Sequence, residues 1–150
     1  MRLRITLLWC LMLLASSAAW TAEERNVRFE AVNVYVDSGE HRLAAYQLEL
    51  SAETGNIKIV GLAGGDHPAF HNPPYYDPEA LRGGRIILAA FDTGDELPTG
   101  RTRVARVHVM VSGETTPQYA VRLEVAGSPG AEEIPATADV ARIDRDASDQ

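Results

Sequence analysis

Apolar and polar residues alternate with a period of two along most of the chain from residue 26 onward, which is the pattern of half-buried β-strands. No longer window shows a good helical repeat. Strands are expected at 26–37, 43–51, 57–62, 85–91, 103–111 and 119–125, with a last short strand between Ile134 and Val140. Glycine, proline and acidic turns separate them. The chain is therefore predicted to be an all-β antiparallel sandwich of about seven to nine strands.

The first expected strand, 26–37, changes its apolar parity halfway. Its apolar residues lie first at odd positions and then at even positions: Val27, Phe29 and Ala31, then Val32, Val34 and Val36. One extra residue in a strand moves every later side chain to the other face of the sheet. The pattern therefore predicts a β-bulge here, or a strand that leaves one sheet and joins the other.

Four other strands have patterns that assign their faces. The stretch 85–91 (RIILAAF) is apolar on both faces, which is typical of a strand in the middle of a sandwich. The strands 43–51 and 103–111 alternate cleanly, so one face of each is expected in the core. A further inward row is expected in the strand 119–125, made by Tyr119, Val121, Leu123 and Val125.

The first 22 residues have the order of a secretory signal peptide. Arg2 and Arg4 precede an apolar run over 5–15, and small residues follow. The apolar run is short for a membrane span, although an uncleaved anchor is the alternative. Cleavage is expected after Ala19 or Ala22. The mature protein is then expected to be exported to the periplasm, the cell surface or the medium, with membrane contact only through the transient signal peptide.

Cysteine content and charge narrow the class of protein further. The single cysteine, Cys10, lies in the signal peptide, so the mature domain must be stabilised by its own core. The formal charge of the whole chain is −7, and it becomes about −9 when Arg2 and Arg4 leave with the signal peptide, since that segment has no acidic residue. Such a surface argues against nucleic acid as a partner. One domain is expected over 23–140, followed by a polar tail over 141–150.

The proline-rich stretch 64–84 (GGDHPAFHNPPYYDPEALRGG) differs from the strands around it. His67 and His71 are four residues apart and would share one face of a helix, but the prolines at 68, 73 and 74 disfavour a helix there. Without the helix, this spacing is no zinc motif. The stretch is predicted to be a stiff crossover lid that also shapes a binding surface.

Several stretches occur in an order that is found in a known family. They are Val32-Asn33-Val34, Ala45-Tyr46 with Leu50, Ile87 to Gly94, and Ala105 to Val111. In this order the chain, over roughly Val27 to Val125, resembles the cohesin domain and the wider group of carbohydrate-binding-module-like sandwiches. The resemblance implies a jelly-roll or cohesin-like sandwich that works as a non-catalytic binding module. Cohesins hold a dockerin on a sheet face, and related sandwiches bind polysaccharide.

The candidate binding surface is a sheet face bordered by the proline-rich stretch and by the loop 92–100. Its candidate residues are Tyr75, Tyr76, Asp77, Asp92, Asp95 and Glu96. An extracytoplasmic protein is favoured over a polysaccharide as the partner, because both tryptophans lie within the first 20 residues. Tyr75 and Tyr76 are adjacent in an extended segment, so their rings are expected to point to opposite sides rather than to share one sugar platform.

No cofactor is predicted, and calcium is the one kept open. Asp92, Asp95 and Glu96, or Asp37 with Glu40, offer hard oxygen ligands, but neither loop matches an EF-hand. The chain has no G-x-S-x-G elbow and no Cys-His pair. It is therefore predicted not to be an enzyme. A small secreted hydrolase and a self-associating structural protein of the envelope are the alternatives.

Overall fold

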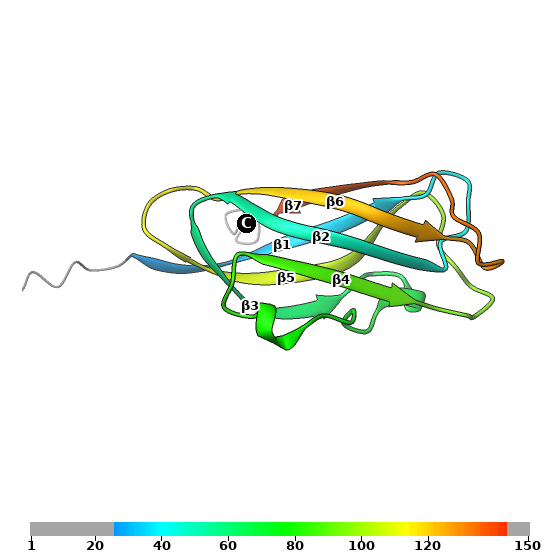
Figure 1. The fold of residues 1–150 in the computed structure, drawn as a ribbon, viewed down its shortest axis with the longest axis horizontal. Coiled ribbons are helices and arrows are strands. Elements are labelled where there is room, and N and C mark those ends of the chain that lie inside the picture. Colours follow the sequence, from blue (N-terminus) through cyan, green and yellow to red (C-terminus); the bar gives the residue numbers. More distant parts are fainter. Residues whose placement is uncertain (1–25, 144–150) are drawn as a thin grey trace, which may run out of the picture.

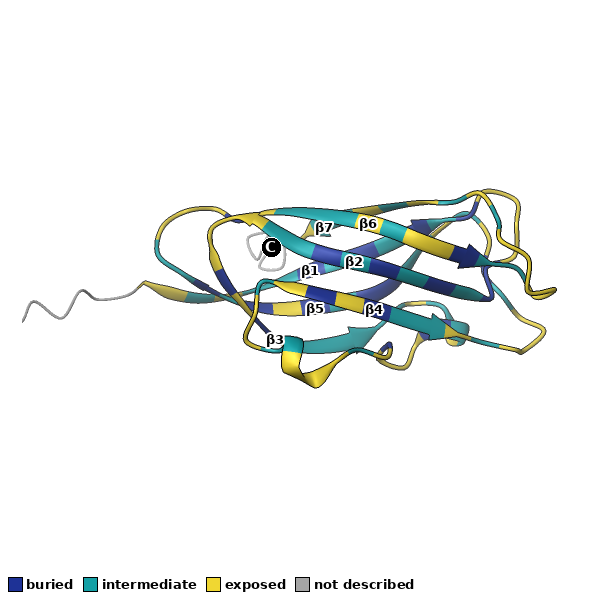
Figure 2. Ribbon diagram, in the orientation of Figure 1, coloured by how far each residue is buried: buried dark blue, intermediate teal, exposed yellow. Residues whose placement is uncertain are grey.

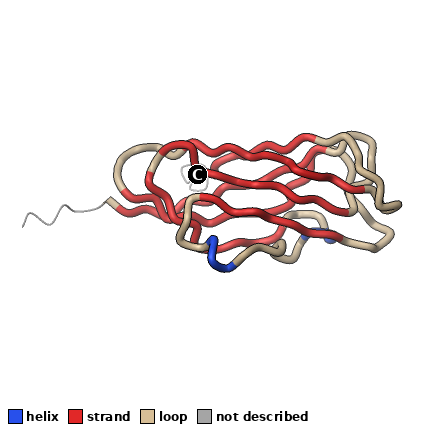
Figure 3. The backbone as a smooth tube through the Cα atoms, viewed as in Figure 1, coloured by secondary structure: helices blue, strands red, loops and turns tan. Residues whose placement is uncertain are grey.

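The alternating apolar residues build two antiparallel sheets, and the predicted all-β sandwich is confirmed (Figure 1). The computed structural model describes residues 26–143. The sheets have the strand orders β3-β5-β1-β7 and β4-β2-β6. The strands are β1 (Val27–Asp37), β2 (Ala45–Thr54), β3 (Asn56–Gly64), β4 (Arg85–Phe91), β5 (Arg101–Ser112), β6 (Gln118–Gly127) and β7 (Thr137–Arg142). Two short 3-10 helices, η1 (Pro68–Phe70) and η2 (Pro78–Ala80), lie between β3 and β4 (Figure 3).

The ends of the chain were predicted separately from the domain. The predicted signal peptide lies outside the described residues, as do residues 144–150 of the predicted tail. The last strand, β7, continues to Arg142, two residues beyond the expected end of the domain.

The core lies between the two sheets and is made by alternate residues of each strand (Figure 2). Its buried side chains include Val32, Val34 and Val36 of β1, Tyr46, Leu48 and Leu50 of β2, and Val107, Val109 and Val111 of β5. The inward faces predicted for β2 and β5 are therefore confirmed. Each side chain of this size contributes roughly 1.5–3 kcal/mol when it is fully buried.

β1 has no bulge where its change of parity predicted one. Its pairing with β5 keeps one register from Val27 to Val34, and the register shifts only after Val34, where Val104 is the extra residue on β5. In both halves of β1, odd-numbered residues therefore point to the outer face of the sheet and even-numbered residues point to its inner face, toward the core. Val27 and Phe29 lie on the outer face of the sheet, where Phe29 is 55% exposed. The prediction was wrong because it placed these two apolar side chains in the core.

β6 has a bulge that its sequence did not reveal. Leu48 and Gln47 of β2 pair with Leu123 and Val125, so Glu124 is the extra residue. The bulge reverses the facing of the strand after Leu123. Val125, predicted to face inward, is therefore exposed, and Ala126 is buried in its place.

β4 is an edge strand, although its apolar sequence predicted a central one. Ile86 and Leu88 face the core, whereas Ile87 and Phe91 are exposed on the outer face. On one side β4 pairs with β2, and on the other its partner is Tyr75 of the proline-rich stretch. A loop segment takes the place of a neighbouring strand at this edge, and the apolar outer face of β4 is exposed.

The proline-rich stretch crosses from β3 in one sheet to β4 in the other and closes this side of the sandwich (Figure 1). Tyr75 exchanges two backbone hydrogen bonds with Ala89 of β4, at 2.8 and 3.0 Å. Ile59 of β3 donates to Gly83 and accepts from Arg82, at 2.9 and 2.8 Å. The segment thereby satisfies backbone groups that edge strands would otherwise leave unpaired.

Two tyrosine hydroxyls that are buried in different surroundings provide a test of this packing. The hydroxyl of Tyr46 donates to the carbonyl of Val104 at 3.3 Å. The hydroxyl of Tyr119 is buried and has no hydrogen-bond partner within residues 26–143. Burial raises the pKa of Tyr119 to about 12 and also raises the pKa of Tyr46, so both stay protonated near neutral pH.

Tyr119→Phe is expected to leave the free energy of unfolding unchanged or to raise it by up to about 1 kcal/mol, because it removes a desolvated hydroxyl. Tyr46→Phe is expected to lower it by about 1 kcal/mol, because a buried carbonyl loses its donor. Urea denaturation followed by circular dichroism measures both variants under the same conditions. If Tyr119→Phe lost more free energy of unfolding than Tyr46→Phe, the hydroxyl of Tyr119 would have a hydrogen-bond partner, which would contradict the structure.

Candidate functional site

Exposed apolar side chains gather at one end of the outer face of the β4-β2-β6 sheet. Tyr75, Phe91 and Val125 are 70%, 65% and 41% exposed. Strand pairing brings them together, because Ala89 pairs with Tyr75 on one side and with Gln47 on the other, and Gln47 pairs with Val125. Isolated exposed apolar residues are ordinary, whereas a contiguous group beside a hollow is a candidate binding surface.

Tyr75 and Phe91 form a stacked pair on this face. Their ring centroids lie 6.2 Å apart and the ring planes differ by 15°. Tyr75 is held in place by its two backbone bonds to Ala89, and Phe91 is the last residue of β4. The pair is therefore carried by ordered backbone, and aromatic pairs of this kind contribute about 0.5–1.5 kcal/mol beyond the area they bury.

An open hollow of about 470 Å³ lies next to this pair. Ala45 and Gly127 are cross-strand neighbours in the hollow, and a Cβ at Gly127 would lie 3.5 Å from that of Ala45. The hollow exists because these two residues have no bulk. It is lined also by Phe91, Val125 and residues of the loop after β6: Ser128, Pro129, Ala131, Glu132 and Glu133.

The loop after β6 that borders the hollow is ordered by backbone hydrogen bonds. The N–H of Ser128 donates to the carbonyl of Glu132 at 2.8 Å, and the N–H of Ile134 donates to Ala126 at 2.9 Å. Ala131 has a φ of 61°, in the left-handed region that a turn of this kind uses. These bonds fix the carboxylate-bearing residues at the border of the hollow.

The charges on the lining of the hollow are all negative. Asp92, Glu132 and Glu133 contribute carboxylates, and no lysine or arginine is among the lining residues that the structure describes. Within the described part of the chain, these three acids form no ion pair. One oxygen of Asp92 accepts from the N–H of Gly94 at 2.7 Å, which orders the start of the loop. The hollow is therefore an apolar floor with an acidic border.

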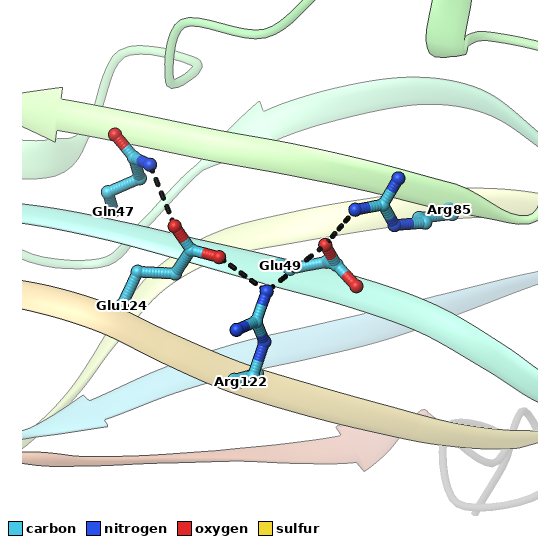
Figure 4. A network of polar contacts seen from close by, with 5 residues as sticks. All are labelled: Gln47, Glu49, Arg85, Arg122 and Glu124. Atoms are coloured by element: carbon cyan, nitrogen blue, oxygen red, sulfur yellow. Dashed lines mark hydrogen bonds and ion pairs between the residues drawn. The ribbon is translucent and has the colours of Figure 1, made fainter.

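The middle of the same sheet face carries a charged ladder that neutralises itself (Figure 4). Arg122 bonds Glu124 at 2.6 Å and lies 3.6 Å from Glu49, which also pairs with Arg85. Gln47 donates to the other oxygen of Glu124 at 3.1 Å. The hydrogen bond from Arg85 is the main cause that lowers the pKa of Glu49. The ladder thus contrasts with the uncompensated acids at the hollow.

The structure places only part of the predicted site on this surface. Tyr75 belongs to the stacked pair, and Asp92 lines the hollow. Tyr76 is half-buried and packs against the core, which agrees with the expectation that the two neighbouring tyrosines point to different sides. Asp77 caps η2 by accepting from the N–H of Glu79 at 2.9 Å.

The other two predicted residues, Asp95 and Glu96, are exposed in the loop between β4 and β5 and do not line the hollow. The carbonyl of Asp95 accepts from Arg42. The prediction missed Phe91, Val125 and the two glutamates of the loop after β6. The adjacent Glu132 and Glu133 were visible as an acidic pair, but only the β6 bulge and the edge position of β4 bring the four residues together.

The histidines of the proline-rich stretch act within their own turn. Nδ1 of His67 accepts from the N–H of Ala69 at 3.2 Å, and Nδ1 of His71 lies 2.8 Å from the carbonyl of Pro68. Across residues 26–143, no three His, Cys, Asp or Glu side chains are close enough together to hold a metal ion. The acids that were weighed as calcium ligands therefore do not form such a group.

Comparison of the chain with protein-family models, with curated proteins and with solved structures found no match. In the part of the chain that the structure covers, no helix has the length and apolar character needed to cross a membrane. The exposed face of the β4-β2-β6 sheet is therefore the feature that points to a function.

Proposed function

We propose that this protein is an exported, non-catalytic binding module that recognises an extracytoplasmic protein through the outer face of its β4-β2-β6 sheet. The observation that carries the proposal is the exposed pair of Tyr75 and Phe91 beside the open hollow. Aromatic residues are enriched at the centres of protein interfaces, where they supply much of the binding energy. Export is inferred from the order of residues in the first 22 positions.

The cohesin-like resemblance of the sequence supports the same proposal, because cohesins bind through a sheet face. The structure adds a physical reason for choosing this sheet. Its middle is covered by paired charges, whereas one end exposes apolar side chains next to a hollow. A buried apolar centre with a polar border is the usual arrangement of a protein interface.

A polysaccharide is the second candidate ligand, and one observation favours it. The exposed rings of Tyr75 and Phe91 are nearly parallel, and flat aromatic faces stack on sugar rings. It ranks lower because sugar hydroxyls need several hydrogen-bonding groups in fixed places. The floor of the hollow, Ala45 and Gly127, offers no side-chain hydrogen bond, and its carboxylates lie only at the border.

Affinity capture from the envelope and secreted fractions tests the proposal, with residues 23–150 as bait, with and without a calcium chelator. Bound material is identified by mass spectrometry and by sugar analysis. Wild type is expected to retain one protein, and Phe91→Ser is expected to weaken its retention by about 30-fold, as loss of an aromatic hot spot does.

Phe29→Ser is the matched control, since Phe29 is also an exposed phenylalanine but lies on the outer face of the other sheet. Its retention of the partner is expected to equal that of wild type. Recovery of glycan alone would replace the protein partner with the second candidate. Equal losses in the two variants would remove the β4-β2-β6 face from the proposal.

A further inference from the structure

We infer that the hollow receives an apolar side chain from the partner that stands next to a lysine or arginine in the partner's sequence. This inference rests on the proposed function and adds the chemistry of the ligand. It commits to a peptide segment with an apolar anchor and an adjacent cation.

The shape of the hollow fits an apolar anchor. The small residues Ala45 and Gly127 leave its floor open, and the side walls are apolar carbon from Phe91, Val125 and Pro129. A volume of about 470 Å³ is at the small end of the range for ligand pockets, and it suits one or two side chains of a peptide better than a globular surface.

The acidic residues at the border favour a positively charged residue next to that anchor in the partner's sequence. Asp92, Glu132 and Glu133 border the hollow and have no cationic partner among residues 26–143, so a positive group arriving there gains attraction and a negative group is repelled. The arginines on the same sheet face, Arg85 and Arg122, are already paired with Glu49 and Glu124. They therefore do not compensate the acids at the hollow.

The stacked rings add a second reason for a cation. Tyr75 and Phe91 expose ring surface beside the acidic border, and guanidinium groups stack well on aromatic faces. The same fold already contains such a contact, because the guanidinium carbon of Arg101 lies 3.5 Å from the ring centroid of Tyr35. An arginine next to the anchor would combine both attractions.

Selection from a random dodecapeptide phage library on the immobilised protein, residues 23–150, tests the inference. Enriched peptides are expected to contain a large apolar residue within about two positions of an arginine or lysine, and to be poor in acidic residues. A synthetic copy of the best peptide is then titrated at low and at high salt. Replacing its cation by glutamate is expected to weaken binding by at least about 10-fold at low salt, and less at high salt.

Two variants locate the binding. Gly127→Leu fills the hollow and is expected to abolish binding of the peptide, with folding checked by circular dichroism. The double variant Glu132→Gln/Glu133→Gln keeps the shape and is expected to weaken binding by about 5-fold or more at low salt. Its matched control is Glu53→Gln/Glu114→Gln, which changes two exposed acids that do not line the hollow and should bind as wild type does.

The inference would be overturned if no peptide is enriched, if enriched peptides are acidic or uncharged, or if Gly127→Leu binds them unchanged. A concentration-dependent dimer in sedimentation velocity that Gly127→Leu abolishes would instead assign the hollow to a second copy of this chain. The proposed function is tested separately, by the envelope capture and its dependence on Phe91. If envelope capture depends on Phe91 while the peptide selection fails, only the chemistry of the anchor is wrong.

Discussion

Phe70→Ala is expected to lower the free energy of unfolding by about 3–5 kcal/mol, the range for removing a buried aromatic side chain. Phe70 lies in the proline-rich stretch, is only 2% exposed and packs edge-on against Tyr46, with 5.4 Å between ring centroids. Phe70 belongs to the buried core cluster, and Tyr76 of the same stretch packs against this cluster while remaining half-buried. Urea denaturation followed by circular dichroism measures the loss.

Tyr75→Ala is the control for this substitution, because it removes another aromatic ring from the same stretch. The ring of Tyr75 is largely exposed and loses mainly its stacking with Phe91, so the expected loss is about 0.5–1.5 kcal/mol. Similar losses in the two variants would show that the stretch is held mainly by its backbone bonds. A loss below about 1 kcal/mol in Phe70→Ala would show that this side of the sandwich is not closed by Phe70.

Gly65→Ala is expected to cost about 3 kcal/mol or more, because the new methyl group has no room. A Cβ at Gly65 would lie 2.0 Å from the carbonyl oxygen of Arg103 in β5. This oxygen is backbone and cannot rotate away. The neighbourhood is also fixed by two bonds, from Gly65 to the carbonyl of Phe70 at 2.7 Å and from Asp66 to Arg103 at 3.1 Å. The alanine must therefore displace the start of the crossover from β5.

Gly61→Ala is the matched control, since Gly61 is a nearby glycine in β3. The nearest heavy atom to its added Cβ would lie 4.0 Å away, in the side chain of His108. The expected change is within about 1 kcal/mol. Thermal and urea unfolding of both variants measure the difference. If Gly65→Ala is no less stable than Gly61→Ala, then the proline-rich stretch does not pass as close to the backbone of Arg103 in β5 as described.

The fold could be predicted from the sequence where alternation and burial agree. In β2 and β5 every second residue is apolar, and these residues form much of the core. The prediction failed where apolar residues stay outside the core. Phe29 of β1 and Val125 of β6 follow the apolar pattern of a buried row, yet both face solvent. A bulge changes facing at one residue, and the surrounding sheet, rather than local composition, decides where that residue falls.

The candidate site could be predicted only in outline. The two bordering segments were identified, and they do contribute Tyr75 and Asp92. The hollow between them was not visible, because it depends on Ala45 and Gly127 being opposite each other on neighbouring strands. These two small residues are 82 positions apart in the chain, and only the register of the sheet places them side by side.

The proline-rich crossover closes only one of the two long sides of the sandwich. On the other side β6 and β7 are edge strands of different sheets, and within residues 26–143 no backbone hydrogen bond joins one strand to the other. We therefore expect amide protons along β6 and β7 to exchange with solvent before those beside the crossover, which hydrogen exchange followed by mass spectrometry measures.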